Sequence, residues 1–299
     1  MGEMITKLII TIIIIVFLTF IFSWFIGYKM TKPKRLKIKS NPKEKLGVDY
    51  ENIEFKSGEN TIKGWYIPSE ENRFTVVYSH GYLENRESFT IDIYRVIEEM
   101  RSLGGNVLCF DFSGSGESDG PCLTCGYREK DDLMKAIDFA KTKSNAPIII
   151  YGISMGAATT ALVTSERDDI AAAICDSPFS NLKEYLSMNL GVWTHLPKFP
   201  FQPIIFKAME KTSGLSLDKV VPAESVKNSK VPILIMHGKG DHLIPYTESV
   251  KLKKLNPDMV TLDIIENDDH CKSLEKQRDR YMENISNFID KVLEDKKKK

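Results

Sequence analysis

The hydrophobic pattern begins with an uninterrupted apolar run, LIITIIIIVFLTFIFSWFI, over residues 8–26. No charged residue breaks this run, and its polar positions are Thr11, Thr19 and Ser23. A helix of this length, rising about 1.5 Å per residue, extends about 28 Å, which is close to the hydrocarbon thickness of a bilayer. The pattern therefore predicts an N-terminal transmembrane anchor over residues 1–28.

Basic residues gather directly after the apolar run. Eight Lys or Arg fall within residues 29–45, whereas only Lys7 and the amino terminus precede the run. A cleaved signal peptide would have a shorter apolar core and a small-residue cleavage site, which YKMTKPKRLKIKSNPKEK lacks. The positive-inside rule predicts a single-pass protein whose C-terminal body is cytoplasmic. We interpret residues 29–47 as a basic linker that is either solvated or in contact with anionic headgroups.

From residue 48 onward, short apolar runs alternate with amphipathic ones. YENIEFKS and TIKGWYIPS predict an antiparallel hairpin around residues 58–60. Six further strands are predicted at FTVVYSHG, NVLCFDF, PIIIYG, IAAAICDSP, VPILIMHG and MVTLDIIE. Helices are predicted over about 88–103, about 129–143, after residue 154 and over about 273–293. Apolar strands that alternate with helices are typical of a parallel sheet covered on both faces. Residues 48–299 are therefore predicted to form one α/β domain with a mostly parallel eight-stranded sheet.

The interval between the sixth and seventh strands, residues 183–230, is too long for a simple crossover. It contains NLGVWTHLPKFPFQPIIFKAMEK, which is too apolar for a solvated loop. We predict a helical lid over the C-terminal edge of the sheet, where ligands bind in open α/β folds. Trp193, Phe199 and Phe201 are predicted to line an acyl-binding wall or, alternatively, to form the core of the lid itself.

The fifth predicted strand runs directly into Gly-Ile-Ser-Met-Gly, residues 152–156, and a small-residue helix follows. A buried strand, Gly-x-Ser-x-Gly and a helix are the context of a nucleophile elbow, in which Ser154 is held out at the edge of the sheet. The alternative is a glycine-containing turn whose serine only caps the helix.

An elbow serine needs a base and an orienting acid, which follow it in the order Ser…Asp/Glu…His in such folds. Among the five histidines, His270 is the candidate base, because it lies on the loop after the last predicted strand. Asp241 is the candidate acid, because it follows the seventh strand, and Asp176, after the sixth strand, is the competitor. The remaining histidines are His80 upstream of the serine, His195 in the lid, His237 in a strand and His242 beside the acid. Asp268 and Asp269 are interpreted as solvated loop charges.

The oxyanion of an acyl-transfer reaction would need two backbone N–H donors. The residue after the nucleophile, Met155, is one predicted donor, and Tyr82 in SHGYLENRESF, after the third strand, is the other. The Tyr82 ring could instead form a wall of the acyl pocket.

Charge is unevenly distributed although the formal net charge is zero. Residues 1–45 hold nine basic and two acidic residues, which leaves 32 basic and 39 acidic residues in the body. An acidic body is a poor surface for nucleic acid, so no nucleic-acid partner is expected. Neither a Walker A pattern nor GxGxxG occurs.

The five cysteines form no even framework. Cys109 and Cys175 fall in apolar strand runs and are predicted to be buried. Cys122 and Cys125 form a single C-x-x-C, which is short of the four ligands usual in zinc sites. We predict a reduced pair near the mouth of the active site, and a redox switch is the alternative.

Taken in chain order, SHGYLEN, DFSGSGESDG, YGISMGA, HGKGDHLIP and DDHCKS resemble the motifs of the α/β-hydrolase superfamily over residues 48–293. The sequence looks most like the membrane-anchored branch near the serine aminopeptidases and monoacylglycerol lipases. Ser113 departs from the pattern, because many relatives carry a basic residue there. The resemblance implies the fold and the triad but no particular substrate.

The motifs together predict a serine hydrolase that cleaves an ester or thioester through an acyl-enzyme. Its partner would be a small acyl substrate, with no metal or organic cofactor implied. A peptidase of the same fold and a non-catalytic membrane scaffold are the alternatives. Because the elbow and the sheet lie downstream of residue 45, a body without residues 1–45 is expected to keep its activity.

Overall fold

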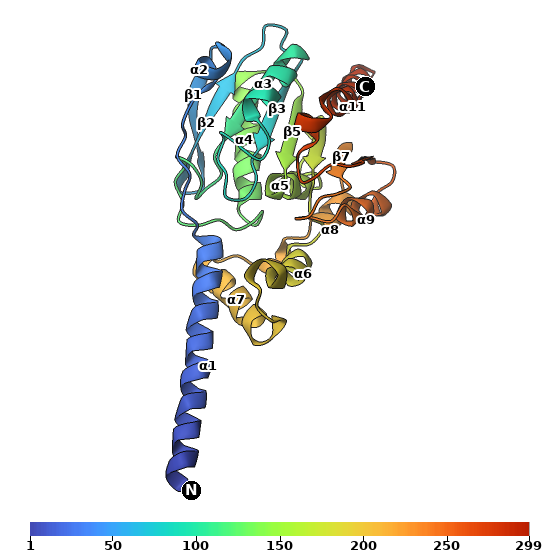
Figure 1. Cartoon of the computed structure of the whole chain (residues 1–299). Helices are drawn as coiled ribbons and strands as arrows, with labels where there is room; N and C mark the ends of the chain where they lie inside the picture. Colours follow the sequence, from blue (N-terminus) through green and yellow to red (C-terminus); the bar gives the residue numbers. More distant parts are fainter. Residues whose placement is uncertain (299) are drawn as a thin grey trace.

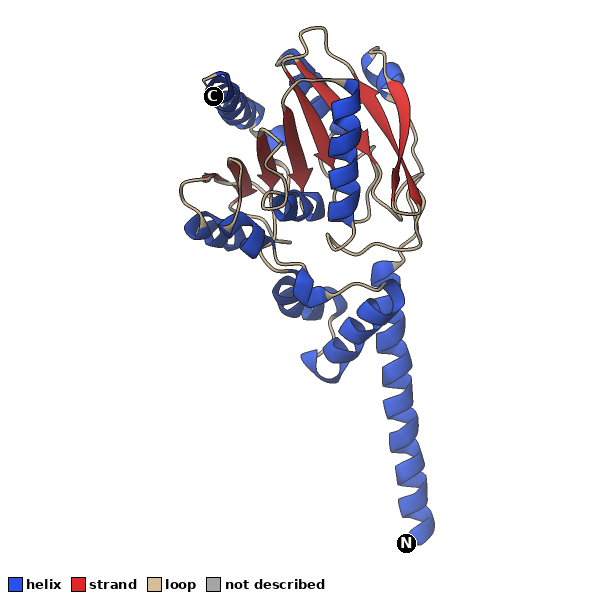
Figure 2. Ribbon diagram, turned by 180° about the vertical axis from the view of Figure 1, so that it is seen from behind, coloured by secondary structure: helices blue, strands red, loops and turns tan. Residues whose placement is uncertain are grey.

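An eight-stranded sheet forms the centre of the body that follows the N-terminal helix (Figure 1, Figure 2). The computed structural model describes residues 1–298. The strands are β1 (Glu51–Ser57), β2 (Asn60–Ile67), β3 (Phe74–Ser79), β4 (Gly105–Phe110), β5 (Ile148–Ile153), β6 (Ala172–Asp176), β7 (Ile233–Gly238) and β8 (Val260–Ile265). Their order in space is β1-β2-β4-β3-β5-β6-β7-β8. The β1–β2 and β2–β4 pairs are antiparallel, and all later pairs are parallel, as the sequence predicts.

Helices cover both faces of the sheet, which explains why β3 to β7 are mostly apolar. Every residue of these five strands is buried. One face packs against α3 (Ile93–Ser102) and α11 (Arg278–Lys297). The other face packs against α4 (Glu129–Lys143), α5 (Met155–Val163), α8 (Pro222–Lys227) and α9 (Thr247–Leu255). Because β3 to β8 are parallel to one another, their C-terminal ends lie at the same edge of the sheet.

Two helix boundaries differ from those predicted. The helix expected from residue 88 begins at Ile93, because the side chain of Asp92 caps α3 by accepting from Tyr94 N–H at 3.0 Å. The helix expected over 273–293 is divided into α10 (Ser273–Lys276) and α11. The division falls at Gln277, whose side-chain amide donates to the Glu266 carbonyl oxygen at 2.8 Å.

The predicted lid is helical but smaller than residues 183–230. It consists of α6 (Leu182–Thr194) and α7 (Lys198–Ser213), which share an apolar cluster of their own. A short 3-10 helix, η1 (Leu217–Lys219), leads back to the body. Val226 of α8 is buried in the core cluster of the sheet, so α8 belongs to the body. Figure 1 shows α6 and α7 below the sheet, with α7 beside the N-terminal helix.

The N-terminal helix, α1 (Gly2–Thr31), projects from the body, and its residues 8–26 carry no charged side chain (Figure 1). It is long and apolar enough to cross a membrane, a property that signal sequences share. Its C-terminal part packs closely on α7: a Cβ on Gly27 would lie 2.4 Å from the Ile205 carbonyl oxygen and 2.7 Å from Ala208 Cβ. Gly27 is therefore required by this helix crossing.

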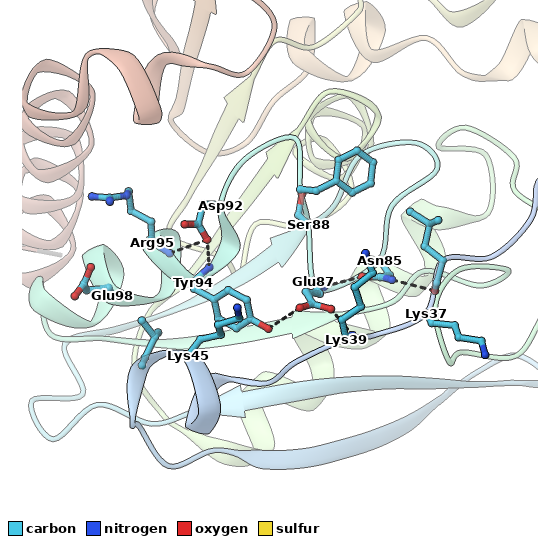
Figure 3. Close-up of a pocket in the computed structure, with 13 residues that line it drawn as sticks. Lys37, Lys39, Lys45, Asn85, Glu87, Ser88, Asp92, Tyr94, Arg95 and Glu98 are labelled. Atoms are coloured by element: carbon cyan, nitrogen blue, oxygen red, sulfur yellow. Dashed lines mark hydrogen bonds between the residues drawn. The ribbon is translucent and has the colours of Figure 1, made fainter.

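The predicted basic linker is docked on the body. Asn85 Nδ2 donates to the Leu36 carbonyl oxygen at 3.0 Å, and Lys39 N–H donates to Glu87 Oε2 at 2.5 Å (Figure 3). The linker then forms α2 (Pro42–Leu46) before β1. A cavity of about 650 Å³ lies between the linker, α3 and the loop before α3. The chain after α1 thus has a fixed path and is not a free tether.

Candidate active site

Ser154 lies at the abrupt turn between β5 and α5. Its φ of 53° and ψ of −119° are unusual for an L residue. A Cβ on Gly152 would lie 2.2 Å from the Gly156 carbonyl oxygen, and a Cβ on Gly156 would lie 2.1 Å from the Ser79 carbonyl oxygen. Only glycine fits at either position, so the two glycines have the steric role expected of a nucleophile elbow.

The Ser154 side chain makes no capping hydrogen bond to α5, although the residue occupies the N-cap position. The alternative in which the Ser154 side chain only caps the helix is therefore wrong. Its backbone N–H donates to the Asp176 carbonyl oxygen at 2.8 Å. A Cβ on Gly81 would lie 3.7 Å from Ser154 Cβ. These contacts place Ser154 at the C-terminal edge of the sheet, beside the loop that follows β3.

His270, on the loop after β8, makes a short hydrogen bond with Asp241, on the loop after β7. His270 Nδ1 lies 2.6 Å from Asp241 Oδ2. An ionised carboxylate only accepts, so Nδ1 carries the hydrogen, and in the neutral imidazole the lone pair is then on Nε2. The next residue, Cys271, has its Sγ 3.8 Å from the same Asp176 carbonyl oxygen that Ser154 N–H binds. The loop of His270 therefore converges with the elbow.

Four donors surround the Asp241 carboxylate. Oδ1 accepts from the backbone N–H groups of Leu243 at 2.9 Å and Ile244 at 2.8 Å. Oδ2 accepts from His270 and lies 3.1 Å from Nε2 of the buried His237. Burial alone would raise the pKa of Asp241, but the hydrogen bonds from His237 and His270 lower that pKa well below its usual range. The carboxylate is thus ionised and held as an acceptor.

The competing acid, Asp176, has other partners. Its Oδ2 accepts from the Tyr281 hydroxyl at 2.8 Å, and its Oδ1 accepts from the Ser177 hydroxyl at 3.0 Å. Burial raises the pKa of Asp176. Within residues 1–298 no hydrogen bond joins its carboxylate to His270, whose Nδ1 is bound to Asp241. The geometry therefore favours Asp241 as the orienting acid.

The two acidic residues before His270 differ from each other. Asp269 is solvated in part, as the sequence predicts, and its Oδ1 lies 2.7 Å from His242 Nδ1. Asp268 is buried, so its interpretation as a solvated loop charge is wrong. Its carbonyl oxygen accepts from Gly240 N–H at 2.8 Å, so this residue joins the loop of Asp241 to the loop of His270.

Tyr82 and Met155, whose backbone N–H groups are the predicted oxyanion donors, both lie beside Ser154. Met155 is the first residue of α5, so its N–H is one of those that a helix leaves without an internal partner. Tyr82 lies in residues 81–87, which we call the oxyanion loop. Both residues line the same pocket as Ser154. Their N–H groups and the N-terminus of α5 would favour negative charge there.

The oxyanion loop is held from within by Glu84, a buried residue that the sequence does not single out. Its carboxylate accepts from Gly81 N–H at 3.0 Å, from the Ser88 hydroxyl at 2.7 Å and from Thr90 N–H at 2.7 Å. A buried carboxylate is stabilised by such donors, and it fixes their backbone in return. Glu84 thereby sets the conformation of the backbone on either side of Tyr82.

An apolar pocket of about 80 Å³ opens at Ser154. It is lined by Met30, Tyr82, Cys125, Ser154, Met155, Phe179, Leu182, Tyr185, Leu186, Trp193, Met209 and Ile244. Of the three predicted lid residues, Trp193 belongs to this lining. Phe199 does not, because its side chain is 81% exposed, and Phe201 packs instead against the cluster shared by α6 and α7.

Two residues that line the pocket come from sequence features outside the lid and the elbow. Met30 belongs to the apolar N-terminal helix, and Cys125 belongs to the C-x-x-C. Cys122 and Cys125 are free thiols, and Cys122 Sγ lies 3.8 Å from the Ser213 carbonyl oxygen. Burial raises the pKa of Cys125, so this thiol is protonated and acts as an apolar wall.

Known proteins resemble this chain in sequence and in fold. The family model "Serine aminopeptidase, S33" matches residues 70–223. The uncharacterized protein YqkD of Bacillus subtilis is 30% identical over 77% of this chain and 76% of its own length. Lysophosphatidylserine lipase ABHD12 of Mus musculus is 28% identical over 66% of this chain, a match that spans 49% of the lipase. The Pyrococcus furiosus esterase Pf2001 aligns with 89% of this chain and 99% of its own at a TM-score of 0.74 and 24% identity. The chain therefore belongs to the serine aminopeptidase S33 family and has the α/β-hydrolase fold.

Proposed function

We propose that this protein is a membrane-anchored serine hydrolase that cleaves carboxylic esters or thioesters of apolar acyl chains. Ser154 is the nucleophile, His270 the base and Asp241 the orienting acid. The observation that carries the proposal is the hydrogen bond between His270 Nδ1 and Asp241 Oδ2, 2.6 Å long. It lies at the same edge of the sheet as Ser154, which lines an apolar pocket. Ester hydrolysis is also the activity named for ABHD12, as a lipase, and for Pf2001, as an esterase.

The reaction would proceed through an acyl-enzyme. Ser154 Oγ attacks the carbonyl carbon while its proton passes to His270 Nε2, and Asp241 stabilises the imidazolium. The carbonyl oxygen, now negative, accepts from the N–H groups of Tyr82 and Met155. Collapse of this intermediate breaks the ester bond, and the leaving alcohol or thiol takes the proton from Nε2. Water, deprotonated by His270, then releases the acid and restores the Ser154 hydroxyl.

The pocket favours an acyl substrate over a peptide with a free amino terminus. An aminopeptidase would need a carboxylate near Ser154 to bind the substrate ammonium group. The pocket lining contains no Asp or Glu among the residues that the structure describes. Its apolar side chains would instead bury the methylenes of an acyl chain, each worth about 0.8 kcal/mol.

Three features support membrane anchoring by α1. The helix carries no charge over residues 8–26, basic residues follow this run, and the C-terminal turn of the helix contributes Met30 to the pocket. A cleaved signal peptide would leave the protein and could not supply Met30 to the pocket. Val192, Trp193 and Phe199 lie at the adjoining ends of α6 and α7. Val192 and Phe199 are exposed, and Trp193 is 40% exposed although it also lines the pocket. Because α7 packs beside α1, they suit contact with the acyl and headgroup boundary of a bilayer (Figure 1).

The activity is tested with the purified full chain in detergent micelles. We expect a fluorophosphonate probe to label the protein stoichiometrically. We also expect p-nitrophenyl esters of medium acyl chains to be hydrolysed faster than p-nitrophenyl acetate, because longer chains fill the apolar pocket. Amino-acid p-nitroanilides serve as the peptidase comparison. Faster cleavage of the anilides would support the aminopeptidase alternative, and a protein that neither reacts with the probe nor cleaves esters would be a scaffold.

The orientation is tested with a C-terminal epitope tag on the full chain in a bacterial host. The eight basic residues after the apolar run predict that the tag stays on the cytoplasmic side. Protease added to intact spheroplasts should leave the tag untouched and should remove it only after lysis. Removal before lysis, while a cytosolic marker stays intact, would reverse the orientation.

A further inference from the structure

The end of α1 and the chain that follows it are bonded to the oxyanion loop at three places. The Tyr82 hydroxyl donates to the Met30 carbonyl oxygen at 2.5 Å. Further on, Asn85 Nδ2 donates to the Leu36 carbonyl oxygen and Glu87 accepts from Lys39 N–H, as Figure 3 shows. Residues 30–39 thus run along the outside of the same loop that Glu84 holds from within.

Met30 also lines the pocket that contains Ser154, and its side chain packs against the apolar cluster of α6 and α7. Its position is fixed by contacts on both sides. Thr31 Oγ1 lies 3.3 Å from Thr212 Oγ1 of α7, and the Thr31 carbonyl oxygen accepts from Leu123 N–H at 2.8 Å. Together with the close crossing at Gly27, these contacts fix the last turn of α1 against both the lid and the body.

We infer that the C-terminal turn of α1 is part of the acyl-binding site, with Met30 as a specificity-determining residue and Tyr82 as the link between α1 and the oxyanion loop. This inference rests on the proposed function. It also reverses one expectation from the sequence. A body without residues 1–45 would lose one wall of the pocket and all three bonds to the oxyanion loop, so α1 does more than fix the location of the enzyme.

The Met30 side chain sets the space available to the substrate. A pocket of about 80 Å³ is small, so shortening one wall residue enlarges it appreciably for an acyl chain. One methylene in a hydrophobic pocket changes discrimination between substrates by about tenfold or more. Met30→Ala should therefore favour longer acyl chains, whereas Met30→Leu, which nearly conserves volume, should keep the original preference.

The Tyr82 hydroxyl affects kcat and not the preference for acyl-chain length. Burial raises the pKa of Tyr82, so its hydroxyl remains a donor at all working pH values. Tyr82→Phe keeps the ring and the backbone N–H but removes the bond to Met30. A less firmly held oxyanion donor weakens an interaction made in the transition state, which lowers kcat and leaves KM nearly unchanged.

The experiment uses the full chain in detergent micelles and p-nitrophenyl esters from butanoate to dodecanoate. Met30→Ala and Met30→Leu are compared with Met4→Ala, a residue of α1 whose side chain is exposed. Tyr82→Phe is compared with Tyr50→Phe, a half-buried tyrosine before β1 that does not line the pocket. Thermal unfolding of each variant is measured alongside.

We expect Met30→Ala to raise the ratio of kcat/KM for dodecanoate over butanoate about tenfold relative to wild type. Tyr82→Phe should lower kcat about tenfold at an unchanged KM, while both control variants match wild type. If the Met30 and Tyr82 variants match their controls while wild type cleaves esters, the inference is overturned and the proposed function stands. If wild type neither cleaves esters nor reacts with a fluorophosphonate, the proposed function itself fails.

Discussion

Replacing Ser154 with alanine should abolish ester hydrolysis and fluorophosphonate labelling while leaving the fold intact. Loss of the nucleophile in a Ser-His-Asp enzyme lowers kcat by about 10⁶-fold, and His270→Ala should be nearly as damaging because the members act as a unit. The fold should tolerate Ser154→Ala because the hydroxyl makes no capping bond to α5. We expect the free energy of unfolding to change by less than about 0.5 kcal/mol.

The matched control for this substitution is Ser187→Ala in α6, which removes a half-buried hydroxyl outside the pocket. Both variants are purified in micelles and compared by probe labelling, by hydrolysis of a medium-chain p-nitrophenyl ester and by thermal unfolding. Ser187→Ala should label and turn over like wild type. Comparable activity in Ser154→Ala would show that the glycine-flanked serine is only a turn and would remove the basis for the proposed mechanism.

Those parts of the site that depend on local geometry could be predicted from the sequence. A buried strand, two glycines and a helix permit few backbone paths at Ser154, and the structure requires glycine at both flanking positions. The chain order of the strands also places the loops after β7 and β8 at one edge of the sheet. His270 and Asp241 meet there because each follows a parallel strand directly.

The contacts of α1 with the pocket and with the lid could not be predicted from the sequence in the same way. The run that forms α1 has no polar face to indicate which side packs, so nothing in its pattern selects Met30 for the pocket. The lid presents the same difficulty. Trp193 reaches the pocket while Phe199 is exposed, and apolar composition alone does not distinguish the two. These positions depend on how α1, α6 and α7 pack together.

The identity of the acid is tested by two asparagine substitutions, with opposite expectations for Asp241 and Asp176. The backbone N–H groups of Leu243 and Ile244 both donate to Asp241 Oδ1. In Asp241→Asn the amide oxygen must take that position, so the amide NH₂ group faces His270 Nδ1. The NH₂ group can only donate there, which moves the imidazole hydrogen to Nε2 and removes the base that accepts the serine proton.

We therefore expect Asp241→Asn to lower kcat by about 10⁴-fold, the loss typical of this change in a Ser-His-Asp triad. Asp176→Asn should behave differently, because the carboxylate that it replaces accepts from the hydroxyls of Tyr281 and Ser177 and not from His270. Its main cost should fall on stability, since one of the two buried hydroxyls must then turn to accept from the amide NH₂ group. The measurement is kcat for a medium-chain p-nitrophenyl ester together with thermal unfolding of both variants. A mild effect of Asp241→Asn on kcat, combined with a severe effect of Asp176→Asn, would assign the orienting acid to the end of β6 instead of the loop after β7.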